Sequence, residues 1–356
     1  MNDERNEPVR QGPRHSVLPD GTLLDCTLRE GPYECRFDTE GITRITRALV
    51  AAGVRHVEVG AETGFGSRPD VDDIGMVMTA REAEPGVAVG VIAGFSRATP
   101  AELRRLADAG ASFVRVAAAA PLWKEALATI GTVRSLGMSA TFNAIKGHSV
   151  SAAEFGRLAR ETTSAGADVV YLVDSAGTML ASDVRDRVSY ARDAGARVGF
   201  HGHDNFSLAV ANSLVAVAEG AVSVDGTLRG IGRSAGNAQI EVLAAALRKQ
   251  GSTHAIDVDA LARAAEELIA PHRARDRGIG HLDLCMGEGG FHSEGLDAAR
   301  EAAERYGVAL GPLLREAGRR DPAGADHDTV VRTALALRVG ASRAPSPRTT
   351  GAEATA

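Results

Sequence analysis

Aromatic residues are scarce in this chain of 356 residues: they make up 4% of it and include a single tryptophan. Valine, leucine, isoleucine and alanine must therefore fill the core that an apolar content of 44% allows. Lysine is also rare, and the formal net charge is -6. An acidic balance of this kind gives no reason to expect binding to nucleic acid or to a membrane surface.

Cysteine is nearly absent as well. The three that occur, Cys26, Cys35 and Cys285, form no disulfide framework, which indicates a reducing compartment. No apolar run approaches the roughly 20 residues of a membrane helix, and the polar start of the chain lacks the apolar core of a signal peptide. We therefore expect a cytoplasmic protein, with disordered ends over residues 1–18 and 342–356.

What the chain does contain is a regular alternation of two patterns. Eight short apolar runs are separated by segments whose apolar residues lie three and four apart, as in helices. The runs are 21–28, 55–60, 87–94, 112–118, 139–145, 168–175, 196–203 and 221–227. Near-continuous apolar strands fit a parallel sheet covered on both faces. Eight such units predict an α/β fold, a (β/α)8 TIM barrel over residues 19–252. The main alternative is an open, doubly wound sheet.

Glycines and capping residues support this division. A glycine ends many helical segments just before the next strand, where a helix C-cap needs one. These are Gly53, Gly110, Gly137, Gly166, Gly195 and Gly220. Thr39, Thr99 and Ser151 are candidate N-caps. From 253 to 341 the strand signals stop, and helical patterns predict a C-terminal helical appendage. It would pack beneath the barrel, bind a partner or reach over the active site.

Polar residues gather where the predicted strands end, which is where barrel enzymes carry their chemistry. Among them are Asp25, Arg29, Glu30, Asn143, Lys146, Ser175, His201, His203, Arg233 and Asn237. Histidine is scarce, 10 in 356 residues, yet two lie two apart in the sequence FHGHDN. Residues 201 and 203 share one side of a strand, so both imidazoles can point inward.

Two imidazoles and one carboxylate make a site for a divalent metal with open positions. Glu30 is the carboxylate that we expect, because only one strand separates the first and seventh strands of a closed barrel. An isolated His-x-His is more often an accident of a loop or core, and an Arg-Glu pair in a turn is usually a solvated ion pair. Their coincidence at strand ends favours metal binding.

Three motifs then suggest a family. DCTLREG (25–31), HGHDN (201–205) and GIGRSAGNA (230–238) resemble, in order and position, the signature of the DRE-TIM metallolyases. That superfamily includes 4-hydroxy-2-oxovalerate aldolases, hydroxymethylglutaryl-CoA lyase, and the isopropylmalate and homocitrate synthases. The segment from HGHDN onward, YLVDSAGTM (171–179) and the C-terminal helical segments are most similar to the aldolase branch.

The resemblance implies a role for several residues. Glu30, His201 and His203 would hold the metal, usually Mn²⁺ or Mg²⁺ in this superfamily. Arg29 would bind the keto oxygen of the substrate and steady the developing enolate. The candidates for substrate binding are Ser175, Asn237, Asp25 and Asn143, with Ser175 in the carboxylate pocket and Asn237 near the metal.

The chain departs from the aldolase pattern at three positions. The metal carboxylate of the aldolases is normally Asp, whereas Glu30 matches the homocitrate synthases. The catalytic His three residues further on is Tyr33 here, and the Tyr of a glycine-rich loop is His292. The two residue types are exchanged, so either His292 or Tyr33 would shuttle the proton. Tyr33 could also be a rim residue without a chemical role.

By this resemblance the protein is expected to be a metal-dependent aldolase. It would interconvert a 4-hydroxy-2-oxo acid with pyruvate plus an aldehyde, through a pyruvate-type enolate held by the metal. Three alternatives stay open: a Claisen-type acyl-CoA-dependent synthase or lyase, a Schiff-base aldolase using Lys146, and a non-catalytic partner subunit. We also expect a homodimer, and catabolic relatives suggest an aldehyde dehydrogenase as a partner of the C-terminal helices.

Overall fold

A computed structural model of the chain describes residues 22–60, 71–252, 255–272 and 278–343. Eight parallel strands pair in chain order, and β1 also pairs with β8, so the sheet closes into a barrel. The strands are β1 (Thr22–Asp25), β2 (His56–Gly60), β3 (Ala88–Gly94), β4 (Phe113–Ala119), β5 (Ser139–Ile145), β6 (Val169–Asp174), β7 (Val198–Gly202) and β8 (Ser223–Gly226). The predicted (β/α)8 barrel is confirmed, and the open sheet is excluded by the β1–β8 ladder.

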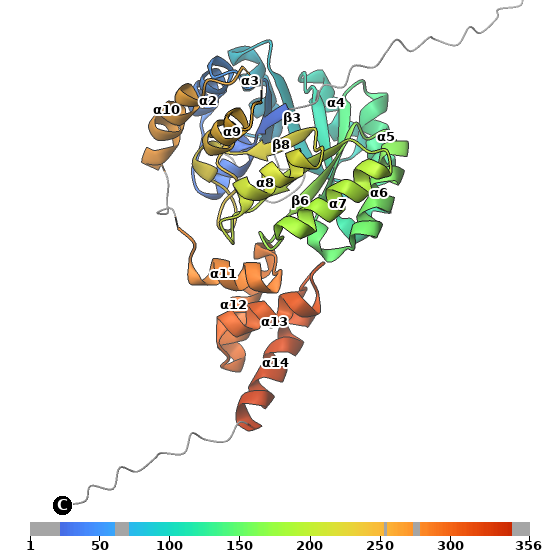
Figure 1. The fold of residues 1–356 in the computed structure, drawn as a ribbon, viewed down its shortest axis with the longest axis vertical. Helices are drawn as coiled ribbons and strands as arrows, with labels where there is room; N and C mark the ends of the chain where they lie inside the picture. Colours follow the sequence, from blue (N-terminus) through green and yellow to red (C-terminus); the bar gives the residue numbers. More distant parts are fainter. Residues whose placement is uncertain (1–21, 61–70, 253–254, 273–277, 344–356) are drawn as a thin grey trace, which may run out of the picture.

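Helices surround this barrel (Figure 1). They are α2 (Thr39–Ala51), α3 (Asp73–Ala83), α4 (Pro100–Asp108), α5 (Leu127–Ser135), α6 (Ala152–Ser164), α7 (Ala181–Asp193), α8 (Ala209–Ala218) and α9 (Ile240–Lys249). Each buries one stripe against the strands; in α2, Ile42, Ile45 and Leu49 are buried at spacings of three and four. Valine, leucine, isoleucine and alanine dominate the core, as the scarcity of aromatics predicts.

The predicted helix ends are largely confirmed. All six C-cap glycines adopt positive φ, between 83° and 111°, which other residues rarely tolerate. Thr99 and Ser151 cap α4 and α6, each in a capping box with a glutamate three residues later. Thr39 is not a cap: Asp38 accepts the hydrogen bond from the Gly41 N–H, so Thr39 is the first residue of α2.

The first predicted strand is shorter than expected. β1 ends at Asp25, and residues 27–30 form the helical turn α1 (Thr27–Glu30). The Asp25 carboxylate accepts hydrogen bonds from both the N–H and the hydroxyl of Thr27, at 2.8 and 2.7 Å. Such local bonds compete with an extended backbone and favour a turn. Arg29 and Glu30 therefore lie on a single helical turn above the barrel, not on the strand itself.

The C-terminal helices divide between two hydrophobic cores. Helix α10 (Val258–Ala264) and the π-helix that follows it (Ala265–Ile269) pack into the barrel core beside α2 and α9. Four further helices form a cluster of their own. They are α11 (His281–Gly289), α12 (Leu296–Tyr306), α13 (Leu310–Arg320) and α14 (His327–Arg343). The sequence did not predict α11. We call α11–α14 the helical appendage.

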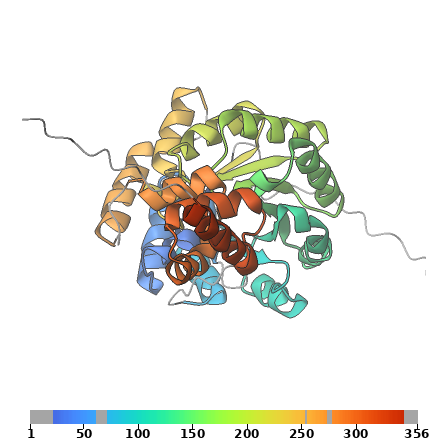
Figure 2. The same cartoon turned by 90° about the horizontal axis from the view of Figure 1, so that it is seen from below.

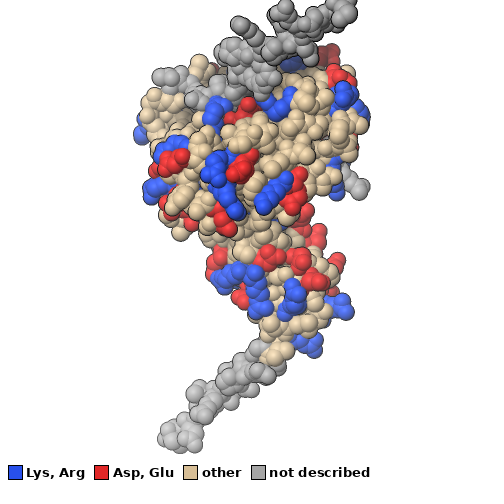
Figure 3. Space-filling model, turned by 90° about the vertical axis from the view of Figure 1, so that its right-hand side faces the viewer, with Lys and Arg blue, Asp and Glu red and all other residues tan. Residues whose placement is uncertain are grey.

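The helical appendage covers the end of the barrel at which the strands finish, as Figures 1 and 2 show. The carbonyl of Gly290 lies 3.3 Å from Nε2 of His148, after β5, and the carbonyl of Asp283 accepts from the Asn205 amide, after β7, at 3.0 Å. Of the three expected arrangements, the helices thus reach over the predicted site. On the face in Figure 3, acidic and basic side chains are interspersed over both parts.

Two sequence predictions fall at the chain ends. The predicted disordered segment 1–18 lies outside the described residues, as does the tail except for residues 342 and 343, which end α14. No helix in the described part of the chain is long and apolar enough to cross a membrane.

The contact between His148 and the helical appendage predicts a pH dependence. Burial lowers the pKa of His148 to about 4. The unfolded chain takes up this proton near pH 6.5, so the folded state loses stability as the pH falls from about 6.5 towards 4. Replacing His148 with Gln should therefore reduce the loss of unfolding free energy between pH 7 and pH 5 by roughly 1–2 kcal/mol. Urea unfolding at the two pH values measures this.

The matched control for that experiment is His327→Gln, at an exposed position at the start of α14. It should leave the loss of stability between the two pH values as it is in the unaltered protein. An equal loss of stability at pH 5 in the His148→Gln variant and in the unaltered protein would contradict the attribution of this loss to His148.

Candidate active site at the carboxyl ends of the strands

A cavity of about 500 Å³ lies between the barrel and the helical appendage. Seven of the ten predicted site residues line it: Arg29, Tyr33, Asn143, Ser175, His201, His203 and His292. Glu30, Asn237 and Asp25 are buried and are not part of this lining. One end of the barrel thus brings together most of the residues that the sequence singled out, although they lie in or just after four different strands and in the segment between α11 and α12.

The predicted metal ligands lie side by side. Glu30, His201 and His203 are all buried, and each offers a ligand atom within 4.8 Å of those of the other two. The two imidazole rings have centroids 5.3 Å apart and meet at 77°. His201 belongs to β7, whereas His203 lies just past its end and bridges to Asn237. The expectation that both rings point inward is met.

Hydrogen bonds fix the orientation of both imidazoles. Nδ1 of His201 lies 2.9 Å from a carboxylate oxygen of Asp225, and Nδ1 of His203 lies 3.2 Å from the carbonyl of Gly236. Both partners are acceptors, so each Nδ1 carries the proton and each Nε2 keeps its lone pair. Burial, followed by Arg29 for His201 and Arg233 for His203, holds both pKa values well below the usual range. Neutral, oriented imidazoles are the form that binds metals.

The surroundings of Glu30 also suit a cation. One carboxylate oxygen contacts Nη1 of Arg29, and the other accepts from the backbone N–H of Arg233 at 3.0 Å. The side-chain oxygen of Asn237 is buried and has no hydrogen-bond partner among the described residues. A buried acceptor without a partner is uncommon and calls for a ligand or water. The donor set of carboxylate, two imidazoles and a nearby amide oxygen therefore fits a divalent metal.

Close packing at this point explains one glycine of the third motif. Gly232 has a φ of +149°. A Cβ there would lie 2.1 Å from the Asn237 amide nitrogen and 2.6 Å from a Glu30 carboxylate oxygen. Because neither atom can give way without disturbing the three-ligand group, only glycine fits this position.

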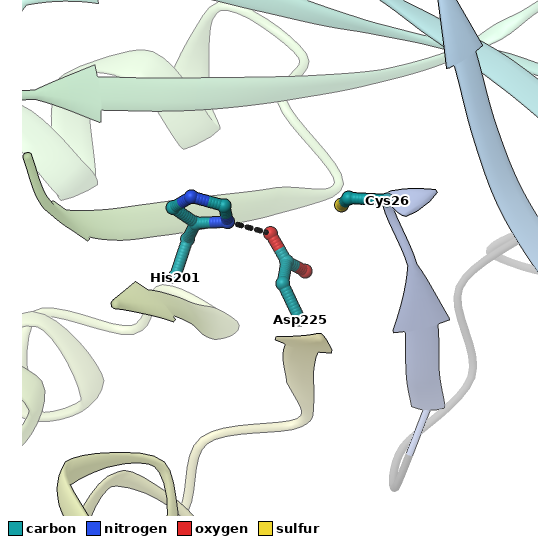
Figure 4. Close-up of side chains that lie close together, drawn as sticks. All are labelled: Cys26, His201 and Asp225. Carbon is teal, nitrogen blue, oxygen red and sulfur yellow. Dashed lines mark hydrogen bonds and ion pairs between the residues drawn. The ribbon is translucent and has the colours of Figure 1, made fainter. Parts of the chain in front are cut away.

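A second group, Cys26, His201 and Asp225, has metal-like spacing too, and Figure 4 shows it. The Asp225 oxygen that faces His201 also accepts from Arg115 at 2.6 Å, so that oxygen is already neutralised. Burial raises the pKa of the Cys26 thiol well above its usual range, so it stays protonated. This group supports His201 and is not a second metal centre.

Sequence reasoning missed Arg115, a fully buried side chain of β4. Its guanidinium donates to Asp225 at 2.6 Å, to Glu58 at 3.3 Å and to Asn143 at 3.1 Å. It also lies 4.0 Å above the ring of Tyr171. A charged residue inside the apolar run FVRVAAA was the available signal.

Arg115 connects the two sides of the site. The same Glu58 oxygen that it contacts accepts from Nε of Arg29 at 2.9 Å. Arg29 is therefore oriented through Glu58, and His201 through Asp225. One guanidinium holds both carboxylates, which makes the orientation of Arg29 and His201 interdependent.

The other predicted residues differ in their hydrogen bonds and in their exposure to solvent. The Ser175 hydroxyl oxygen accepts from the backbone N–H of Lys146 at 2.8 Å, which leaves its own proton for the cavity. Tyr33 is 38% exposed at the rim, and His292, 6% exposed, contacts the guanidinium of Arg233. Asp25 is bonded to Thr27 outside the cavity lining, and burial raises its pKa to about 7.

Comparison with known proteins identifies the family of the chain. The family model described as HMGL-like matches residues 21–268. The chain belongs to the HMGL-like family. The resemblance of its three motifs to the DRE-TIM metallolyases is thereby confirmed, and the matched range spans the whole barrel together with α10.

Relatives within the HMGL-like family match over most of their length. The protein named 4-hydroxy-2-oxovalerate aldolase 2 of Rhodococcus opacus is 34% identical over 328 residues, which covers 89% of this chain and 94% of that one. A 4-hydroxy-2-oxovalerate aldolase of Bacillus thuringiensis is 34% identical over 326 residues, covering 88% and 95%. Among solved structures, the carboxyl transferase domain of Rhizobium etli pyruvate carboxylase with oxamate and biotin shares the fold. Its TM-score is 0.74 at 17% identity, over 91% of this chain and 61% of that one.

The arginine inside the barrel predicts a large stability effect. Replacing Arg115 with Met leaves Glu58 and Asp225 buried without their shared cation, which should cost about 3–5 kcal/mol of unfolding free energy. Urea denaturation measures the loss. The matched control, Tyr171→Phe, keeps the ring beneath the guanidinium and removes one 2.7 Å bond to Ser223, which should cost only about 1 kcal/mol. An Arg115→Met variant as stable as the control would contradict the interdependence of these charges.

Proposed function

We propose that this protein is a divalent-metal-dependent aldolase that interconverts a 4-hydroxy-2-oxo acid with pyruvate plus an aldehyde. The observation that carries the proposal is the group of Glu30, His201 and His203, with both imidazoles neutral and oriented, beside Arg29 at a cavity. The names of the relatives over most of the chain, 4-hydroxy-2-oxovalerate aldolase, support the same reaction.

The metal-holding residues would be Glu30, His201 and His203, with Mn²⁺ or Mg²⁺ as the expected ion. When bound, the cation supplies Lewis-acid chemistry at a keto oxygen. Asp225 and the carbonyl of Gly236 keep the two imidazoles in the tautomer that this needs. Asn237 bridges to His203 through its backbone, and its side-chain oxygen has no hydrogen-bond partner among the described residues.

Arg29 stabilises the negative charge that develops as the carbon–carbon bond breaks. Its guanidinium is anchored by Glu58 through Nε and by Glu30 through Nη1, and the side chain lines the cavity. A fixed cation of this kind favours the enolate without reorganising, because it is already oriented. The Ser175 hydroxyl, whose oxygen accepts from the Lys146 N–H, donates to the carboxylate of the 2-oxo acid.

Cleavage also requires a base for the proton of the 4-hydroxyl. His292 serves this role: it reaches the cavity from the helical appendage and shares the Arg233 guanidinium with His203. Burial and the neighbouring Arg233 hold its pKa well below the usual range, so it is neutral at pH 7. Tyr33, on the rim of the same cavity, is the other residue able to take part.

Two other reaction mechanisms can be distinguished from the proposed metal-dependent aldol reaction. Lys146, the Schiff-base candidate, is bonded to Ser175 through its backbone and does not line the cavity. A Claisen-type acyl-CoA enzyme is the second candidate, favoured by Glu30 and by a histidine, His292, in the loop after α11. A homodimer and an aldehyde dehydrogenase partner stay predictions.

A panel of 2-oxo acids and aldehydes incubated with the Mn²⁺-loaded protein tests the proposal. Carbon–carbon bond formation, followed by NMR, should occur with pyruvate plus an aldehyde and stop when a chelator is added. Release of free thiol from acetyl-CoA plus a 2-oxo acid, with no reaction between pyruvate and the aldehydes, would decide for the Claisen enzyme. Activity that survives chelation and is lost to borohydride would decide for a Schiff base.

Replacing His201 with Ala should abolish metal binding and nearly all activity, because one of the three ligands is lost. Mn²⁺ binding followed by electron paramagnetic resonance is the measurement. The control is Asn212→Ala on α8, a buried polar residue bonded to the carbonyl of Met179, which should keep its Mn²⁺. Unaltered Mn²⁺ binding in His201→Ala would remove that residue from the metal site.

Replacing Arg29 with Ala should separate metal binding from turnover. The variant should retain Mn²⁺ but lose kcat by on the order of 100-fold or more, since an oxyanion partner is commonly worth several kcal/mol. Steady-state kinetics beside a metal titration measure both effects. A near-normal kcat would exclude Arg29 from the chemistry.

A further inference from the structure

We propose that Arg233 forms a binding subsite for a second carboxylate, so that the aldehyde used by this enzyme carries a negative charge. This inference rests on the proposed function and narrows its substrate class. The structure points to it through a partly buried guanidinium that faces the cavity and has no carboxylate partner among the described residues.

The contacts of Arg233 are unusual for an arginine that is partly withdrawn from solvent. Nη2 lies 3.1 Å from Nε2 of His203, and Nη1 lies 3.2 Å from the hydroxyl of Ser293 and contacts the ring of His292. All three partners are neutral. Its backbone N–H, not its side chain, bonds to Glu30.

The other two arginines of the site are neutralised. Arg29 pairs with Glu30 and Glu58, and Arg115 pairs with Glu58 and Asp225. Removing a cation from water without a counter-charge is costly. A bound anion is what Arg233 lacks.

Metal binding would increase the need of Arg233 for a negatively charged partner. The lone pair of His203 Nε2 that accepts from Arg233 is the same lone pair that a metal would take. A metal-bound His203 cannot accept this hydrogen bond, so Nη2 loses its partner while a divalent charge is added nearby. An anionic group of the substrate, entering from the cavity, would satisfy the freed donors.

A carboxylate fits these donors well. The guanidinium offers parallel N–H groups in a planar fork that match the two oxygens of a carboxylate. Ser293, beside Nη1, can add a hydroxyl donor, and both residues line the cavity. Glu294 and Asp297 also line it, but their side chains are 69% and 91% exposed, so water screens their charge.

Two unreactive 2-oxo acids of equal length test the subsite. Both 2-oxoadipate and 2-oxohexanoate have six carbons and lack the 4-hydroxyl, so neither can be cleaved, and only the first has a distal carboxylate. Isothermal titration of the Mn²⁺-loaded protein should show tighter binding of 2-oxoadipate, on the order of 10- to 100-fold. The ratio should fall to near one in Arg233→Met and be partly kept in Arg233→Lys.

A control variant, Arg185→Met, removes an arginine that pairs with Glu219 on the barrel exterior and should keep the preference. Electron paramagnetic resonance on each variant first establishes that Mn²⁺ is bound. Equal affinity of the unaltered protein for the two acids would overturn the subsite and leave the proposed function standing. A preference that survives Arg233→Met would overturn the assignment to Arg233. If the Mn²⁺-loaded protein binds neither acid, the proposed function fails, and the subsite fails with it.

Discussion

A single guanidinium inside the barrel, that of Arg115, bridges the two buried carboxylates on which the site depends. Glu58 on β2 orients Arg29, and Asp225 on β8 orients His201. In a low-dielectric interior such charges are tolerable only as a complete set, because an unpaired member would cost several kcal/mol. The barrel supplies this set on strands that cannot shift independently, which keeps the positions of Arg29 and His201 linked.

The residues of the site come from two parts of the chain. Glu30, His201 and His203 belong to the barrel and are tied to its interior. His292 and Ser293 come instead from the helical appendage, which has its own hydrophobic cluster and meets the barrel at the cavity. Arg233, in the loop after β8, contacts His203 of the barrel and His292 of the helical appendage.

The barrel and the proximity of Glu30, His201 and His203 were predictable because each depends on local signals. These signals are eight apolar runs, six glycines at helix ends and a His-x-His at the end of a strand. Each reflects the geometry of the backbone over a few residues. The limits of the strands were predicted less accurately than their number. β1 stops at Asp25 because that side chain bonds to Thr27, a competition that no periodicity reveals.

What the sequence could not show are contacts between distant strands. In the sequence, Arg115 is a charged residue in an apolar strand with no evident partner. Its partners, Glu58 on β2 and Asp225 on β8, come close only in the closed barrel. Helix α11, HLDLCMGEG, was not predicted because it ends in Gly-Glu-Gly, and glycine disfavours a helix. Its packing against α13 overrides that local preference. The surroundings of Arg233 depend likewise on the helical appendage folding back over the strand ends.

The most direct measurement is the anomalous scattering of manganese from a crystal soaked in Mn²⁺. The account predicts one strong peak among the Glu30 carboxylate and the Nε2 atoms of His201 and His203, with the Arg233 guanidinium displaced from His203. A map with no peak there, and with Arg233 still bonded to His203, would contradict the metal-dependent chemistry and leave only the barrel.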